Sequence, residues 1–343
     1  MKKFILNIIL FCLFVFLLSF IINIIPLKIQ NGNDHFVVKD NYYKYHSSNF
    51  NTIFLGSSRT FRQINPYVFD SIVKINGTDI TSFNFGAPAT FFPECFYLIN
   101  YLSSRYKFNN VFLELQPVND IGKQNIFAYK SYYYLNHHFI NFVINFAYYS
   151  NMPITSKIDF SGKYLLSYFY KLVAGKYVSI LQQNSSGQYV LGKNNNGYFA
   201  LDEQLASIKT ESQEINNNRN KLLKDTTLLS VRKRASKSAL NENDGDNMIL
   251  KKYLEKLSED FQNKNINLYF IIPPRLSNYS DYYALKNSAM KNRIIDLSNG
   301  DDFPEFYQIK YSFDIGHLNN DGARLYTKAL AEKYLEILKI KDK

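Results

Sequence analysis

Five short apolar segments recur along this 343-residue chain, and each ends at a glycine, a proline or a polar residue. Short apolar runs of this kind are typical of buried strands, whereas a 3–4 residue apolar spacing indicates a helix. Segments with helical spacing follow the runs, and such alternation favours a parallel sheet covered by helices on both faces. We therefore predict a three-layer α/β fold with a mostly parallel sheet. The expected strands are 51–55, 80–85, 111–115, 266–272 and 292–297, and the expected helices are 66–73, 93–106, 248–261 and 322–338.

The N-terminus carries a different signal, an uncharged apolar run over residues 4–25 that is closed by Pro26. At about 1.5 Å per residue, a helix of this length covers the roughly 30 Å hydrocarbon core of a bilayer. Lys2 and Lys3 would hold the N-terminus in the cytoplasm and direct the rest of the chain outward. A cleaved signal peptide is the alternative, but its apolar region is usually shorter, and no small-x-small site precedes Pro26. We predict an uncleaved transmembrane signal anchor ahead of the α/β domain.

These signals give an expected domain organisation. Residues 1–26 form the membrane anchor, and 27–50, which show no clear period, form a linker. The α/β domain covers 51–338 and is interrupted by an insertion at about 125–247. The first part of the insertion, 125–180, is dense in Tyr, Phe and Ile and is expected to form helices of a cap or side wall. Its aromatic rings would pack between helices or stack on sugars.

The charge, the cysteines and the histidines limit the partners, disulfides and metal sites that the sequence predicts. The net charge is +11 and the pI is near 9.2, but the lysines are dispersed, and no nucleic-acid motif accompanies the basic run 231–237. An anionic lipid or polysaccharide explains this charge more simply, so we predict no nucleic-acid partner. Cys12 lies inside the expected membrane span, which leaves Cys95 without a disulfide partner. No metal-ligand spacing occurs, since the neighbouring His137 and His138 point to different sides of any element, and we predict neither metal nor cofactor.

Three segments at strand ends or loops carry candidate catalytic groups: Gly56–Arg59, Asn84–Gly86 and the loop that holds Asp314 and His317. In parallel α/β sheets, function gathers at the carboxyl ends of the strands. Asp314 and His317 are three residues apart, so the carboxylate can orient the imidazole toward a hydroxyl. The alternative for this loop is a capping and turn cluster, since Asn, Asp and Gly favour turns and helix starts.

The first of these segments, Gly56–Arg59, admits two further readings. It would be an ordinary strand-to-helix turn, or a phosphate cradle in which Arg59 assists. The loop is too short for a P-loop, and a phosphate cradle explains neither Asp314 nor His317. We expect Arg59 to anchor the loop.

Taken together and in this order, the three segments resemble the blocks of the SGNH/GDSL hydrolase superfamily. The resemblance covers about residues 50–123 and 248–338. It implies that Ser58 is the nucleophile and that Asp314 and His317 complete a catalytic triad. It also implies that the oxyanion hole is formed by the amides of Ser58 and Gly86 with the side chain of Asn119.

The chain departs from the family pattern at two places. Pro117 replaces the glycine of the third block, and Ser57 replaces the aspartate of the first, which leaves Ser57 as an alternative residue to face the site. Weak third blocks and a long N-terminal anchor are typical of family members similar to the proteins that modify alginate and lipoteichoic acid.

The resemblance therefore implies a single-pass protein of the bacterial inner or cytoplasmic membrane with an extracytoplasmic catalytic domain. It would act as an acyl ester hydrolase or O-acyltransferase on O-acyl groups of cell-surface polysaccharide or on a small ester. A membrane-bound acyltransferase is the expected protein partner. The alternative is a catalytically inactive scaffold that binds polysaccharide or such a partner.

Overall fold

The computed structural model describes most of the chain, in two compact units that we treat separately. Unit 1 comprises residues 1–37 and 125–187, and unit 2 comprises residues 38–124 and 188–343. The described residues are 2–24, 35–90, 94–115, 134–149, 152–181, 188–207, 212–241, 248–275 and 290–341.

Unit 2 is built on a five-stranded sheet in the order β2-β1-β3-β4-β5, and every neighbouring pair of strands is parallel. The strands are β1 Thr52–Leu55, β2 Ser82–Asn84, β3 Asn110–Glu114, β4 Asn267–Ile272 and β5 Ile294–Asp296. Each one overlaps a strand predicted from the apolar segments. The predicted α/β class, with a parallel sheet flanked by helices, is confirmed.

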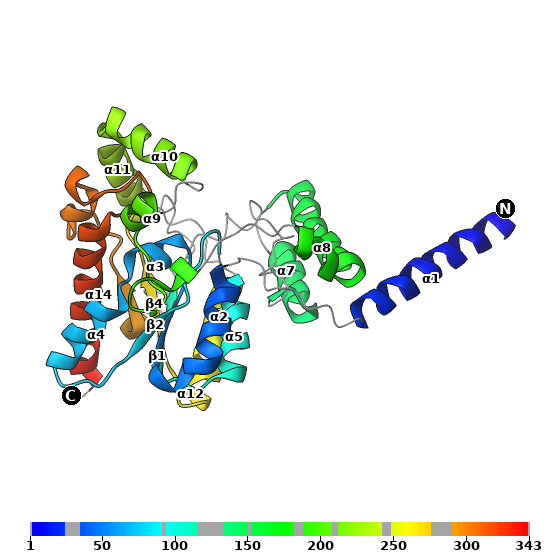
Figure 1. Ribbon diagram of the computed structural model, residues 1–343, viewed down its shortest axis with the longest axis horizontal. Helices are drawn as coiled ribbons and strands as arrows, with labels where there is room; N and C mark the ends of the chain where they lie inside the picture. The colour runs from blue at the N-terminus through cyan, green and yellow to red at the C-terminus, as the bar shows by residue number, and fades with distance from the viewer. Residues whose placement is uncertain are drawn as a thin grey trace. The chain divides into compact units, whose positions relative to one another are not determined.

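Helices cover both faces of this sheet (Figure 1). α4 (Pro66–Ile75) and α14 (Asn320–Lys341) pack together on one face, and α2 (His35–His46), α5 (Glu94–Arg105) and α12 (Met248–Asn263) lie on the other. The short α3 (Ser58–Gln63) follows β1 directly and contacts α14. The short 3-10 turns are η1 Ser47–Asn49, η3 Gln188–Leu191, η4 Lys291–Arg293, η5 Pro304–Tyr307 and η6 Ile309–Tyr311.

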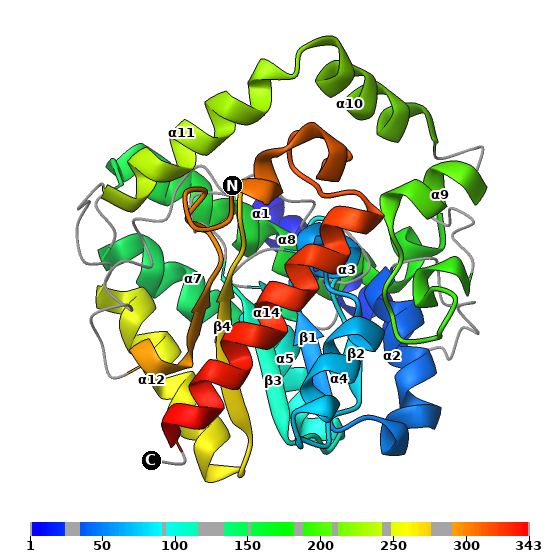
Figure 2. The same cartoon turned by 90° about the vertical axis from the view of Figure 1, so that its left-hand side faces the viewer.

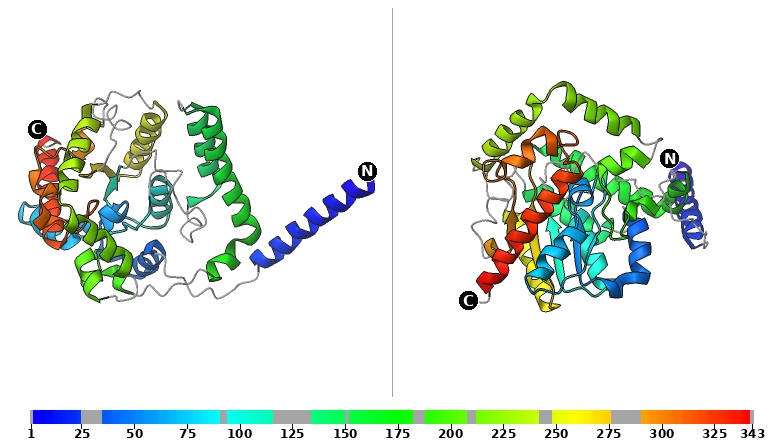
Figure 3. Two further views of the ribbon diagram at one scale, coloured as in Figure 1. Left: turned by 90° about the horizontal axis from the view of Figure 1, so that it is seen from above. Right: turned by 60° about the vertical axis from the view of Figure 1, so that its left-hand side comes forward.

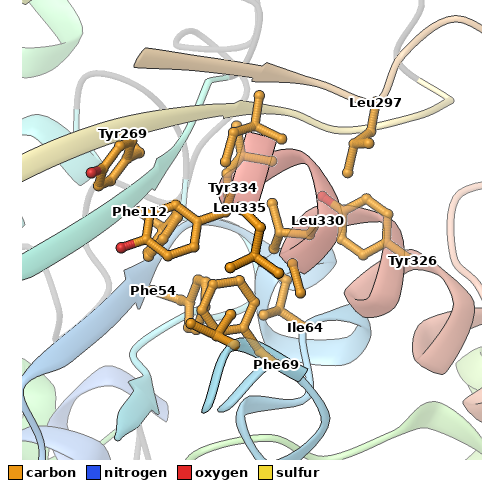
Figure 4. Close-up of a cluster of buried hydrophobic side chains, with 14 of the residues drawn as sticks. Phe54, Ile64, Phe69, Phe112, Tyr269, Leu297, Tyr326, Leu330, Tyr334 and Leu335 are labelled. Atoms are coloured by element: carbon orange, nitrogen blue, oxygen red, sulfur yellow. The ribbon is translucent and has the colours of Figure 1, made fainter. Parts of the chain in front are cut away.

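The core between the sheet and α14 is an aromatic stack across three strands (Figure 4). Phe112 of β3 stacks on Phe54 of β1 with ring centroids 4.9 Å apart and on Tyr269 of β4 at 5.1 Å. Tyr334 of α14 meets Phe112 and Tyr269 edge-on, each at 5.1 Å. Aromatic pairs in these geometries contribute about 0.5–1.5 kcal/mol beyond their burial. The stack holds β1 and β3 side by side. The strand order reverses between these two strands, and in such sheets a ligand crevice is expected outside the carboxyl ends of the strands at this point.

The segment expected to be a linker, 27–50, is in part a packed helix. Within the described residues it forms α2 and η1, and Lys39 and Tyr43 are fully buried. The Tyr43 ring lies 4.9 Å from Phe85 and 5.2 Å from Phe83, beside edge strand β2. The linker expectation was wrong here because Phe36, Val37 and Tyr43 of α2 are buried, although polar residues separate them along the chain.

The expected insertion, 125–247, is divided between the two units at residue 187. Its second half belongs to unit 2 and contacts the edge strand of the sheet, since the Asn84 N–H of β2 donates to the Asn196 carbonyl at 2.8 Å. Gly197 has a left-handed φ of 82°, and a Cβ there would overlap the Asn84 carbonyl. The remaining helices of this half are α9 Leu201–Ser207, α10 Ser212–Lys224 and α11 Thr227–Asn241 (Figures 2 and 3).

Unit 1 contains α1 (Lys2–Ile24), α7 (His137–Tyr149) and α8 (Ile154–Leu181). α7 and α8 pack through aromatic side chains, among them Phe139 against Tyr164 and Phe146 against Phe160. In α1 the structure describes the side chains of residues 3–18 and 21, and the Phe, Ile and Leu side chains among them are exposed. Counting only the described residues, no helix is long and apolar enough to cross a membrane.

Candidate active site

The turn after β1 carries two serines that differ in burial and in hydrogen bonding. β1 ends at Leu55, Gly56 follows, and Ser57 caps α3 by accepting a hydrogen bond from the Arg59 N–H at 3.1 Å. Ser58 is the first residue of α3 and is half-buried, whereas Ser57 is buried. An N-cap serine with extended backbone is the usual way to start a helix without a preceding turn.

A buried carboxylate holds this turn in place. Glu114, the last residue of β3, accepts hydrogen bonds from the Ser57 N–H at 2.9 Å and the Ser57 hydroxyl at 2.8 Å. It also accepts from the Thr60 N–H at 3.2 Å and the Thr60 hydroxyl at 2.5 Å. Hydrogen bonds to an ionised group are among the strongest in proteins, so β3 fixes the start of α3.

Glu114 was not predicted as a functional residue. A carboxylate within the apolar run Val111–Leu115, at the carboxyl end of a buried strand, was the available signal. Such a carboxylate is costly to bury unless nearby donors satisfy it. The same contacts exclude Ser57 from the site, because its hydroxyl is engaged by Glu114.

Ser58, His317 and Asp314 lie in one hydrogen-bonded line. Ser58 Oγ is 2.8 Å from His317 Nε2, and His317 Nδ1 is 3.0 Å from each carboxylate oxygen of Asp314. Ser58 and His317 are brought together from positions 259 residues apart in the chain. This is the order of contacts that a serine nucleophile, an imidazole base and an orienting carboxylate need.

The charge state of Asp314 sets the tautomer of His317. Burial would raise the pKa of Asp314, but the charge of His317, its hydrogen bond and the Gly316 and His317 amides outweigh it and lower the pKa to about 2. An ionised carboxylate only accepts hydrogen bonds, so His317 Nδ1 carries the proton. In the neutral imidazole, Nε2 then presents its lone pair to the Ser58 hydroxyl.

The loop that carries Asp314 and His317 is a tight hairpin. Ser312 and Leu318 form an isolated antiparallel bridge, and the Phe313 N–H donates to the His317 carbonyl at 3.0 Å. Asp314 Oδ1 accepts from the Gly316 and His317 amides, both at 2.7 Å. The turn function that was the alternative for this loop is therefore present, and the same carboxylate also contacts the imidazole.

A buried arginine ties this hairpin to the sheet. Arg275, which follows β4, donates to the Asp314 carbonyl at 2.9 Å, the His317 carbonyl at 3.0 Å and the Ser312 hydroxyl at 2.6 Å. Its Nε also donates to the Phe306 carbonyl at 2.7 Å. Burial is the main reason that the pKa of Arg275 falls to about 10. Arg275, which follows the two prolines after β4, was not predicted as a functional residue.

Two side chains cap the start of α14, the helix that follows the hairpin. Asn319 Oδ1 accepts from the Gly322 N–H at 2.9 Å, and Asp202 of α9 accepts from the Asn320 N–H at 2.6 Å. Tyr198 donates its hydroxyl to Asn320 Oδ1 at 3.0 Å. Residues 198–202 come from the expected insertion, so that segment supports the position of the hairpin and of His317.

Gly86 does not fit the oxyanion role expected for it. Its N–H donates to Asn84 Oδ1 at 2.8 Å, and an amide has one proton to give. Asn84 in turn donates to the Thr60 and Ile64 carbonyls, both at 2.7 Å, so it brackets α3 against β2. Gly86 instead serves close packing, because a Cβ there would overlap the backbone nitrogen of Phe61.

A buried lysine completes this bracket. Lys39 of α2 donates to the Gly86 carbonyl at 2.5 Å and lies 3.9 Å from the centroid of the Phe61 ring. Burial, with repulsion from Arg62, lowers the pKa of Lys39 well below its usual value. Asn119, the third residue expected in the oxyanion hole, lies outside the described residues.

Replacing Glu114 with glutamine is expected to lower the free energy of unfolding by about 2–3 kcal/mol, since an amide nitrogen would then face the backbone donors. Denaturant unfolding monitored by circular dichroism measures this change. Glu259→Gln, at an exposed position of α12, is the matched control and should shift stability by less than about 0.5 kcal/mol. Equal stability of both variants would show that Glu114 does not hold the turn.

Gly86→Ala is expected to destabilise the protein by about 1–3 kcal/mol, because the added methyl group must displace the backbone of α3. Gly162→Ala is the matched substitution in α8, where a Cβ meets nothing within 4 Å. Alanine there should increase the stability of the helix by about 0.5–1 kcal/mol. Opposite changes in unfolding free energy are predicted, and a neutral Gly86→Ala would contradict the close packing.

Comparison of the sequence with protein-family models and with curated proteins finds no match. Within the residues that the structure describes, no group of three or more His, Cys, Asp or Glu side chains is placed to hold a metal ion. The site is therefore defined by its own geometry.

Proposed function

We propose that this protein is an SGNH-type acyl ester hydrolase or O-acyltransferase. The observation that supports this is the contact of Ser58 Oγ with His317 Nε2 at 2.8 Å, with Asp314 on the other imidazole nitrogen. A capping cluster needs Asp314 but gives no reason for His317 to meet a serine at the end of β1. The strand order, with its reversal between β1 and β3, is the flavodoxin-like order and agrees with this class.

In the proposed reaction, Ser58 Oγ attacks the acyl carbonyl while His317 Nε2 takes the hydroxyl proton. Asp314 stays ionised and stabilises the imidazolium that forms. The same proton is then given to the leaving alcohol, which departs and leaves an acyl-Ser58 ester. Water or a sugar hydroxyl attacks this ester in the second half, with His317 again acting as the base. The bond between the acyl carbon and Ser58 Oγ then breaks, and His317 returns the proton to Ser58.

The negative charge on the carbonyl oxygen needs donors. The Ser58 N–H, at the start of α3, has no acceptor within the helix and is the proposed first donor. Asn119 stays a proposed donor from the family resemblance. Gly86 would contribute only if its bond to Asn84 Oδ1 opened.

We further propose that residues 1–26 anchor the protein in the membrane and place unit 2 outside the cytoplasm. The support is the uncharged sequence 4–25 behind Lys2 and Lys3, together with the exposed apolar side chains of α1. Substrates carried on cell-surface polysaccharide, and an acyltransferase partner in the membrane, agree with that placement.

The occupied Gly86 amide favours one alternative function. A protein of this fold with an incomplete oxyanion hole would serve as a scaffold that binds polysaccharide or a membrane acyltransferase. Such a scaffold would bind substrate without turning it over, since an unstabilised oxyanion costs roughly 2.7–4 kcal/mol per missing donor.

Turnover of a chromogenic acetyl ester by the full chain in detergent micelles separates these proposals. An enzyme releases the chromophore above the background rate, and a scaffold does not. A sugar added to the assay as acyl acceptor then distinguishes the two reactions. A transferase yields the acetylated sugar, whereas a hydrolase yields only acetate.

A further inference from the structure

Arg59 does not anchor the nucleophile loop as the sequence suggested. Its backbone N–H bonds to Ser57 Oγ, but its guanidinium Nε is buried and has no hydrogen-bond partner among the described residues. A buried donor of a charged group without an acceptor costs free energy, and native proteins rarely retain one. The loop is held by Glu114, so the Arg59 side chain is not needed for that task.

The Arg59 side chain leaves the backbone one residue after the proposed nucleophile, and its charge acts on Arg275, which holds the hairpin of His317. Arg59 follows Ser58 directly on the first turn of α3, and consecutive Cα atoms lie about 3.8 Å apart. The long side chain of arginine lets the guanidinium reach a group bound beside the Ser58 hydroxyl. Arginine is suited to this, because its planar fork of donors matches carboxylates, phosphates and sulfates.

Arg275 lies within electrostatic range of two other guanidinium groups, those of Arg59 and Arg232. Arg275 holds the Asp314 and His317 carbonyls, and the charges of Arg59 and Arg232 both oppose its ionisation. Arg232 comes from α11, which packs on η5 beside Arg275. Like charges placed together raise one another's energy, and an anion among them removes that cost.

We propose that Arg59 binds an anionic group of the substrate, a carboxylate, phosphate or sulfate, adjacent to the ester that Ser58 attacks. The inference rests on the proposed function for its location and names the substrate class, an ester on an anionic molecule. Arg275 and Arg232 contribute positive field and are not required to touch the anion.

Anion binding is tested directly with inorganic phosphate as the probe. Calorimetric titration of the full chain in detergent micelles, at constant ionic strength, gives the dissociation constant for the protein and for Arg59→Gln. Loss of one charged donor pair is expected to weaken phosphate binding about tenfold to a hundredfold. Arg105→Gln removes the same charge from an exposed position at the end of α5 and should bind phosphate as the unsubstituted protein does.

Titrations with sulfate and with acetate compare the anion classes in the same way. A second readout is kcat/KM for two esters of 4-nitrophenol, the neutral acetate and the anionic hemisuccinate. Arg59→Gln is expected to lower the ratio of the anionic to the neutral value by about tenfold.

The outcomes for the anion site and for the enzyme are independent. Phosphate binding that is equal in the protein and in Arg59→Gln, or absent from both, overturns the anion site even if esters are turned over. Phosphate binding that requires Arg59 supports the anion site. If no ester is turned over in that case, the proposed enzyme fails and the anion site stands. Ser58→Ala should keep phosphate binding, which separates the two functions within one variant.

Discussion

Ser58→Ala is expected to lower kcat on a chromogenic acetyl ester by about 10³-fold or more. Alanine removes the only atom that can form the acyl-enzyme bond, while His317 and Asp314 stay in place. The substitution removes a half-buried hydroxyl at the first position of α3 and leaves the cap on Ser57 intact. We therefore expect nearly unchanged unfolding free energy, measured by thermal and denaturant unfolding of the same preparation.

Ser57→Ala is the matched control at the neighbouring position. It removes the cap of α3 and the hydrogen bond that the Ser57 hydroxyl donates to the Glu114 carboxylate, so it should cost about 1–2 kcal/mol of stability. Its kcat should fall far less than that of Ser58→Ala, because the Ser57 hydroxyl faces Glu114 and not His317. The reverse order of effects on kcat would mean that Ser57 is the nucleophile.

Asp314→Asn is expected to lower kcat by about 10³–10⁴-fold at neutral pH. The asparagine oxygen can still accept from the Gly316 and His317 amides, so the hairpin is retained. The imidazole, however, loses the carboxylate that keeps the proton on Nδ1, and Nε2 no longer faces Ser58 as a base. Measuring kcat together with the circular dichroism spectrum separates lost chemistry from lost structure.

The pH dependence of stability follows from the same residue. Because the pKa of Asp314 is lowered from 3.8 to about 2, its ionised form stabilises the fold fully above about pH 4. That contribution is lost as the pH falls toward 2, when the carboxylate takes up a proton. Asp314→Asn should remove this pH dependence from the unfolding free energy. An identical acid unfolding profile in the variant would contradict the ionised carboxylate.

Much of the fold was predictable because each strand of the sheet is a short apolar run with a clear end. Phe54, Phe112 and Tyr269 lie in such runs, and their burial follows from the alternation of strand and helix. The burial of α2 could not be predicted, since the segment is rich in polar residues and shows no apolar period that would indicate the contacts of Tyr43. The segment 188–202 was missed for a related reason: it pairs with the edge of β2 through backbone atoms such as the Asn196 carbonyl, which leave no side-chain pattern.

The candidate site divides in the same way. The contact of Ser58 with His317 and of His317 with Asp314 could be predicted because side-chain chemistry and order along the chain carry the pattern. The hydrogen bond that occupies the Gly86 amide could not be predicted, because it depends on where the Asn84 side chain lies. Glu114 and Arg275 bind backbone groups of other segments, and such contacts become visible only when the strands are assembled.

The most direct test of the central claim is labelling of the full chain in detergent micelles with a fluorophosphonate probe, followed by mass spectrometry of the peptides. Fluorophosphonates react with a serine that an adjacent base activates. The proposed triad predicts one modified residue, Ser58, and loss of the label in His317→Ala. Absence of label at Ser58 in the folded protein would contradict an active triad and leave the scaffold as the function of this fold.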